Sequence, residues 1–367
     1  MVSEGIHMLQ NKFFRTCLGI IAILLIIFLA SKVSFIFQPL LLAFNILVIP
    51  ISLAGFMYYL LRPIVNYLHD KNMHRSIAVL FIYLVVTGLI ILFFMLVWPT
   101  LRKQIFNFID STPFIIEGIQ TQLNELQNNR FWSKMIPSES EITSTITDLI
   151  DRLINTVTNS VANFIGVVSN VVIVLATVPI ILYYMLKESH KLPDKLLHLV
   201  PRRFRKDGRQ VLQEIDTALS QFIIGRVLLN LALGAMMYVG FLILGLKYAL
   251  LLAVLSAILN FIPYVGAILA SIPVVVVAFI QSPSTAIWAL IIILVAQQIQ
   301  DNILTPVIYG KQLDVHPLTI IILLLIGADL YGILGLILCV PIYMIFKILL
   351  VRIYELFLSE RVEDVIE

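Results

Sequence analysis

The sequence predicts an all-α polytopic membrane protein, and two observations point to this class. Hydrophobic residues make up 60% of the chain and charged residues only 13%, whereas soluble domains carry about 25% charged residues. Long apolar runs also recur along the whole chain, and about 20 apolar helical residues cross the hydrocarbon core of a bilayer. These runs place the protein in a lipid bilayer. The net charge of +3 is modest and the basic residues of the chain lie in loops beside the apolar runs, so we expect no binding to nucleic acid.

Six apolar runs have the length of full transmembrane helices. They cover residues 17–37, 39–61, 76–98, 161–186, 222–246 and 285–308. Two further runs, residues 249–280 and 318–351, are too long for one crossing and too short for two, and glycine and proline interrupt both. The prediction is therefore six full transmembrane helices plus two broken or re-entrant helical hairpins, about eight membrane segments in all.

Basic residues orient these segments. Arg62, Lys71 and Arg75 follow the second span, and a larger basic cluster follows the fourth. Because loops rich in lysine and arginine stay in the cytoplasm, both loops and the two termini are expected there. Residues 99–160 then fall outside the cell, and a capping pattern at Ser138 with an apolar stripe at helical spacing predicts amphipathic helix in this segment.

The predicted organisation has six parts. These are a three-helix membrane region (1–98), an extracytoplasmic amphipathic helical segment (99–160), the fourth transmembrane helix (161–187), a basic cytoplasmic helical loop (188–221), a core with both broken segments (222–351) and a cytoplasmic tail (352–367).

The first broken segment contains the stretch NFIPYVGAILASIP at residues 260–273. Pro263 removes a backbone donor, Gly266 permits unusual backbone angles, and Asn260 can bond the freed carbonyls. Irregular backbone cannot face lipid, so this break is expected to face protein or a water-filled cavity.

The second broken segment contains GADLYGILGLILCVP at residues 327–341. Its GLILCVP resembles GAILASIP of the first segment with one residue fewer. Two hairpins in this order would form an inverted repeat in the C-terminal half, as in secondary transporters, and two kinked single crossings are the alternative.

Charged and polar side chains at membrane depth are the candidate functional residues, because such groups are costly there. Arg226 in the fifth span and Asp301 in the sixth can form a pair, and Gln297, Asp301 and Thr305 share one helix face. These residues either line an aqueous cavity or form a buried ion pair that only fixes packing. Asp329 at the second break is either a cation or proton site or the cap of a half-helix.

Enzyme signatures are absent from the sequence. It has no H-E-x-x-H, G-x-S-x-G or G-x-G-x-x-G motif, and its six histidines are scattered. Cys17 and Cys339 lie far apart in apolar runs, which argues against a disulfide framework or a metal cluster. We therefore expect no enzymatic activity, no metal and no cofactor.

Four stretches together resemble a known family. EIDTALSQFIIGRVLLN, NFIPYVGAILASIP, QQIQDNILTPVIYGKQLDVHPL and GILGLILCVPIY occur in this order, and this set is similar to the autoinducer-2 exporter family of bacterial multipass membrane transporters. The resemblance implies a secondary transporter in the bacterial cell membrane and a homo-oligomer, with a pentamer as one candidate. It also implies either export of a small polar solute such as autoinducer-2 or exchange of sodium or lithium for protons.

The leading hypothesis is export of a small polar solute coupled to an ion or proton gradient. The expected pathway residues are Asn260, Pro263, Tyr264, Gly266, Gln297, Gln298, Asp301, Asn302, Gly327, Asp329, Gly332 and Gly335, with a structural pair of Arg226 and Asp301 and hinges at Pro273, Pro306, Pro317 and Pro341. The alternatives are a monovalent cation/proton antiporter, a non-transporting membrane scaffold and, third, an intramembrane enzyme.

Overall fold

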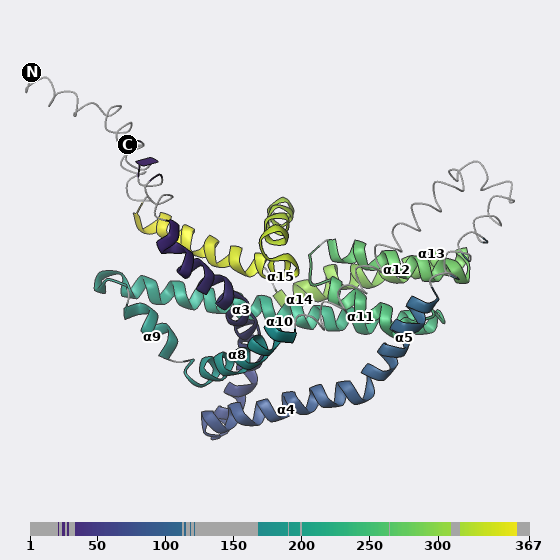
Figure 1. The fold of residues 1–367 in the computed structure, drawn as a ribbon, viewed down its shortest axis with the longest axis horizontal. Helices are drawn as coiled ribbons and strands as arrows, with labels where there is room; N and C mark the ends of the chain where they lie inside the picture. Colours follow the sequence, from purple (N-terminus) through teal and green to yellow (C-terminus); the bar gives the residue numbers. More distant parts are fainter. Residues whose placement is uncertain are drawn as a thin grey trace, which may run out of the picture. The chain divides into compact units, whose positions relative to one another are not determined.

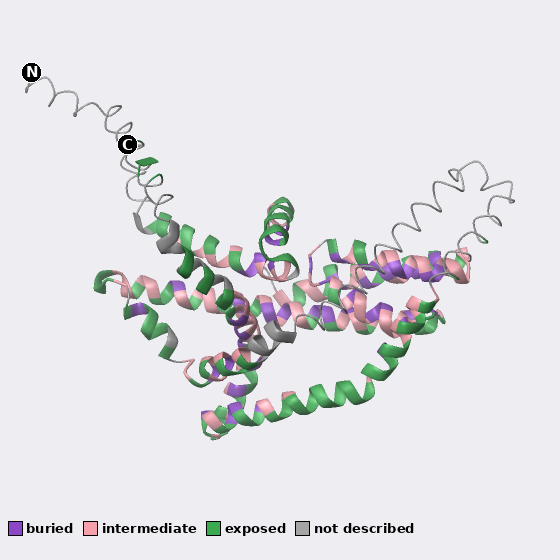
Figure 2. Ribbon diagram, viewed as in Figure 1, coloured by how far each residue is buried: buried purple, intermediate pink, exposed green. Residues whose placement is uncertain are grey.

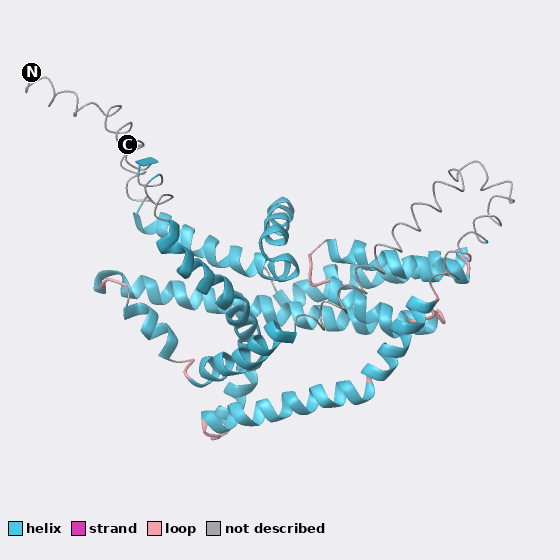
Figure 3. Cartoon of the chain, viewed as in Figure 1, coloured by secondary structure: helices cyan, strands magenta, loops and turns pink. Residues whose placement is uncertain are grey.

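The computed structural model describes residues 34–111, 168–189, 191–198, 200–263, 265–309 and 316–357, with single positions between residues 21 and 28 and between 114 and 121. Within these ranges the regular elements are all helices and no strand occurs (Figures 1 and 3). The predicted first span and the extracytoplasmic segment beyond Ser111 lie largely outside the described residues. The all-α prediction is confirmed.

The described helices run in chain order from α3 to α15. They are α3 (Ser34–Asp70), α4 (Arg75–Leu96), α5 (Trp98–Asp110), α8 (Val168–Lys187), α9 (Lys191–His198), η1 (Arg202–Phe204), α10 (Arg205–Ile243), α11 (Ala249–Leu259), α12 (Val265–Gln281), α13 (Pro283–Ile299), the π-helical segment η2 (Gln300–Leu304), α14 (Thr305–Tyr309) and α15 (Pro317–Phe357).

Five helical stretches in the described part of the chain are long and apolar enough to cross a membrane. They are Ile46–Asp70, Arg75–Leu96, Arg202–Ile243, Pro283–Tyr309 and Leu334–Glu355. Large apolar side chains remain exposed on them, as at Leu84 on α4, which is 71% exposed, and most of α4 lies on the surface (Figure 2). Such faces are compatible with lipid and not with water, so the fold is that of a polytopic membrane protein.

The chain divides into two compact units, Met1–Leu53 and Ala54–Glu367. In the second unit, the C-terminal part of α3 packs with α4 and α8. Their buried contacts are Ala54, Tyr58, Leu61, Val65, Ala78, Val79, Ile82, Leu182 and Leu186. The predicted second span ends at residue 61, but α3 continues to Asp70, because Tyr58, Leu61 and Val65 extend one buried stripe at helical spacing.

A second difference from the prediction concerns the basic loop. The expected boundary between residues 221 and 222 lies inside α10, one continuous helix that already begins at Arg205. Val211 and Leu219 are buried on the same helix as Ile223, so apolar packing carries the helix through its basic, polar first half.

The main core lies among α10, α11, α12 and α13, which pack on their neighbours in sequence. Its buried side chains include Leu233, Phe241, Leu252, Val274 and Ala289. α11 and α12 run antiparallel and both are shorter than a membrane span, so the first broken run forms a helical hairpin (Figure 1).

The second broken run also turns back on itself. Inside α15 the backbone leaves helical geometry at Tyr331 and Gly332, and Gly332 has a φ of 58°. Its first arm is short, but the second arm, Leu334–Glu355, has the full length of a membrane span. The two arms are therefore unequal in length. The sequence analysis took residues 318–351 to be too short for two membrane segments. The second arm is longer than expected because the helix continues beyond residue 351 to Phe357.

Glycine allows the arms of both hairpins to approach closely. A Cβ at Gly266 would overlap the carbonyl of Leu259, and a Cβ at Gly335 would overlap the carbonyl of Gly327. In each hairpin the second arm thus crosses backbone of the first, near the glycines that the two sequence stretches share. Pro273 and Pro341 lie farther on, inside continuous helix.

Candidate functional site

The turn between α11 and α12 is organised by the side chain of Asn260, which is 4% exposed. Its Nδ2 donates to Oδ1 of Asn230 at 3.1 Å and to Oε1 of Gln300 at 3.2 Å. Its Oδ1 accepts from Nε2 of Gln297 at 3.5 Å, and its backbone carbonyl accepts from the guanidinium of Arg226. One side chain at the break therefore ties α10, α13 and the π-helical segment together.

The local sequence explains why the chain turns here. Pro263 has no backbone N–H, so it cannot continue the hydrogen bonding of α11. Gly266 then bonds its N–H to the carbonyl of Ile262 at 3.0 Å and lies against the end of α11 without a side chain. These residues close a tight turn whose remaining polar groups point to neighbouring helices.

The π-helical segment Gln300–Leu304 places a second group of polar residues. The N–H of Thr305 bonds to the carbonyl of Gln300, five residues back, and the wider turn relieves the clash that Pro306 would make with the carbonyl of Asn302. π-segments of this kind are frequent at functional sites. Here it leaves Gln300 buried beside Asn260.

A cavity of about 520 Å³ lies at this turn, and we call it the central cavity. Its polar lining comprises Arg226, Asn260, Gln297, Gln300, Asp301 and Thr305. Phe222, Leu229 and Tyr309 add apolar and aromatic surface, and Ile320 and Val340 of α15 form a further wall. Volume and lining are those of a site for a small molecule that contacts several polar groups.

An incompletely bonded amide lies next to Asn260. Asn230 is 2% exposed, and among the described residues its Nδ2 is buried without a hydrogen-bond partner. A buried donor without a partner costs about 1–3 kcal/mol. A water molecule or a ligand oxygen would remove that cost.

Several predicted pathway residues line the central cavity. They are Asn260, Pro263, Gln297 and Asp301, together with Arg226 of the predicted pair. Gly266 lies buried at the same turn, and Tyr264 is outside the described residues. Arg226 and Asp301 both line the central cavity, and whether they form the predicted pair stays a prediction.

Other predicted pathway residues lie elsewhere. Gln298 and Asn302 are exposed and bond each other at 2.5 Å, because the side chains of neighbouring positions point to different faces of a helix. The residues of the second break, Gly327, Asp329, Gly332 and Gly335, do not line the central cavity. The wall expected from them is formed by Ile320 and Val340 of the same helix.

The predicted hinges are also distributed differently. Pro306 follows the π-helical segment and Pro317 begins α15, whereas the helices break between α11 and α12 and at Tyr331 and Gly332. Whether any of these prolines acts as a hinge stays a prediction.

The lining residues that the sequence analysis missed include Gln300, Phe222 and Tyr309. Gln300 stands three positions after Gln297, so helical spacing could have indicated it. Phe222 and Tyr309 are aromatic residues near the ends of apolar runs, and nothing in the sequence separates them from packing residues.

A multipass helical membrane protein with a broken helical hairpin turning beside a polar cavity has the architecture of a membrane transporter. Within the described residues no cluster of histidine, cysteine and acidic side chains could hold a metal ion.

The chain belongs to the AI-2E family of transporters, whose family pattern matches residues 18–355. It is 36% identical over 364 residues to "Putative transport protein YueF" of Bacillus subtilis, covering 97% of this chain and 98% of that protein. It is 28% identical to "Putative transport protein YrrI" of the same organism over 93% of this chain and 95% of that protein. "Putative permease PerM" of Escherichia coli is 28% identical over 48% of this chain and 51% of that protein. The family assigns the chain a role in transport across a membrane.

Proposed function

We propose that the protein is a secondary transporter that exports a small polar solute, such as an autoinducer-2-like signal molecule, coupled to an ion or proton gradient. The observation that supports this is the central cavity at the tip of the α11–α12 hairpin. Amide groups of Asn260, Gln297 and Gln300 can both donate and accept hydrogen bonds. A neutral solute with several hydroxyl groups suits such a lining better than a bare ion does.

We further propose that the α11–α12 hairpin is re-entrant, entering and leaving the membrane on the same side. Cysteines introduced at Lys247, before α11, and at Ser284, after α12, are both accessible positions. A membrane-impermeant thiol reagent should label both from one side in oriented vesicles. Labelling from opposite sides would show that the segment crosses the membrane and is only kinked.

The coupling charge is proposed to reside on Asp301, the carboxylate of the central cavity. Asp301→Asn removes this charge with little change in volume, so gradient-driven flux in proteoliposomes should fall by about tenfold or more. Asp329→Asn is the matched control, because Asp329 is an equally exposed carboxylate that lies outside the cavity lining. Equal flux in both variants and the parent would remove the coupling role of Asp301.

The same assay separates the alternatives. A monovalent cation/proton antiporter is favoured by the same carboxylate, and it would move sodium or lithium against a pH gradient without any organic solute. A scaffold would give no flux of either kind. Uptake of labelled solute and of sodium, measured with and without an imposed pH gradient, therefore distinguishes a solute exporter, a cation/proton antiporter and a scaffold.

A further inference from the structure

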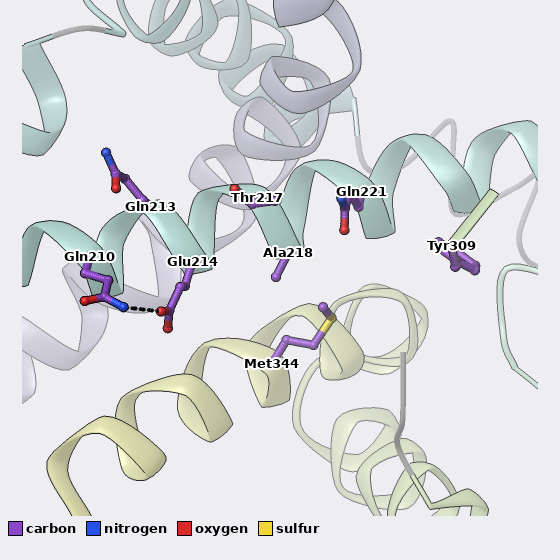
Figure 4. Close-up of a pocket in the computed structure, with 8 residues that line it drawn as sticks. All are labelled: Gln210, Gln213, Glu214, Thr217, Ala218, Gln221, Tyr309 and Met344. Carbon is purple, nitrogen blue, oxygen red and sulfur yellow. Dashed lines mark hydrogen bonds between the residues drawn. The ribbon is translucent and has the colours of Figure 1, made fainter. Parts of the chain in front are cut away.

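A second cavity meets the central cavity at the side chain of Tyr309. This second cavity, of about 430 Å³, lies between α10 and the second arm of α15, and we call it the vestibule (Figure 4). Its polar lining comes from α10 and consists of Gln210, Gln213, Glu214, Thr217 and Gln221. Met344 faces them from α15, and Tyr309 of α14 stands at the end where Gln221 lies (Figure 4). Tyr309 lines both cavities.

The two cavities are linked along α10. The vestibule ends at Gln221, and the lining of the central cavity starts with Phe222 and continues through Arg226 and Leu229. From Gln210 to Leu229 this route would extend about 28 Å along the helix axis. The side chain of Tyr309 lies on this route, because it lines both cavities.

Three contacts hold this ring at the junction. It stacks on the ring of Phe222, with centroids 6.3 Å apart and planes 15° from parallel. Its hydroxyl donates to the backbone carbonyl of Phe222 at 3.2 Å. Gly225 makes room for it, because a Cβ there would overlap the ring.

The element that carries the ring is short. α14 is five residues long and directly follows the π-helical segment. One neutral hydrogen bond and one ring stack are weak enough to break and reform during a transport cycle.

We propose that Tyr309, stacked on Phe222, is a gate between the vestibule and the central cavity, which small polar solutes pass when the ring swings away from α10. The gate rests on the proposed function, because it presupposes that the central cavity holds the transported solute. In this proposal Tyr309 and Phe222 limit the size of the solute that can pass, and the polar groups of the central cavity bind the solute.

The experiment uses a reporter cysteine at Thr305, which lines the central cavity beyond the gate. A membrane-impermeant thiol reagent is added from each side in oriented vesicles, and the rate of modification is measured. We expect Tyr309→Ala and Phe222→Ala to raise this rate about tenfold from the vestibule side, because each removes the ring stack. Tyr309→Phe keeps the ring and should keep the slow rate.

Gly225→Ala tests the gate without removing either ring, because the added methyl group must displace Tyr309. It should also raise the rate. Leu231→Ala is the matched control on an exposed face of α10, at a side chain that is 65% exposed, and should change nothing. Cys17 and Cys339 are native, so each variant without the Thr305→Cys change supplies the background rate, and elution as one sharp peak in detergent shows that it is folded.

Two results would contradict the gate, and only the second of them would also contradict the proposed function. A rate that is equally fast with and without the ring of Tyr309 removes the gate but leaves the central cavity as a water-accessible site. A reporter that stays unmodified from both sides in every variant shows a cavity closed to water, which removes the gate and the proposed function together.

Discussion

Replacing Asn260 with leucine is expected to abolish transport and to lower the stability of the folded protein by about 2 kcal/mol. Leucine has the same number and branching of side-chain heavy atoms, so the change removes the hydrogen bonds while keeping the outline of the side chain. Oδ1 of Asn230 and Oε1 of Gln300 would each lose the donor that Asn260 supplies. A buried polar group without a partner costs about 1–3 kcal/mol, and partners found elsewhere in the membrane reduce that cost.

The loss of transport follows because Asn260 orients both sides of the central cavity. Without it, the amides of Gln297 and Gln300 are free to turn, and the solute meets a lining that is no longer fixed. Solute flux in proteoliposomes and the midpoint of thermal unfolding in detergent measure the two effects.

Asn302→Leu is the control for this change. Asn302 is exposed, and its side chain bonds to Gln298 within the same stretch of helix. It should leave stability and flux close to those of the parent. If both leucine variants behave alike, Asn260 does not organise the site.

The second large effect is expected from alanine at Gly266 or Gly335. In each case the added Cβ would overlap a backbone carbonyl of the other arm of the hairpin, that of Leu259 or of Gly327. Backbone cannot move aside as a flexible side chain can, so the hairpin must open. We expect a loss of about 2–4 kcal/mol, as for severe overpacking, and strongly reduced yield of folded protein.

Gly88→Ala provides the comparison. A Cβ at Gly88 meets nothing within 4 Å, and α4 is helical at this position. Alanine is a better helix former than glycine by about 1 kcal/mol, so this variant should be neutral or slightly more stable. Yield in the membrane and thermal midpoint in detergent give the comparison, and tolerance of alanine at Gly266 and Gly335 would contradict the tight crossing of the arms.

The first break was predictable because its cause is local. Pro263 lacks an N–H and lies close to Asn260 and Gly266 in an otherwise apolar run, so this combination favours a break in the helix, and irregular backbone must face away from lipid. The second break was harder to place. The sequence stretch holds three glycines and a proline, and the chain turns at Gly332, where φ is positive, while Pro341 fits inside a helix.

Which polar side chains share the central cavity was only partly predictable. Helical spacing grouped Gln297 with Asp301, and both line it. The sequence analysis also predicted Gln298 and Asn302 as pathway residues, although they are exposed and do not line the cavity. The local widening at Gln300–Leu304 changes which side chains face inward, and a regular helical count cannot anticipate it.

By itself the sequence determined the class of protein, the apolar segments and the position of the first break, because these depend on hydrophobicity and on the backbone chemistry of proline and glycine. Only the tertiary structure decided that Asn260 bonds to Asn230 and Gln300 and that Tyr309 stacks on Phe222 between two cavities. These contacts join residues 30 to 87 positions apart. Their geometry depends on how whole helices pack, which no local pattern of residues specifies.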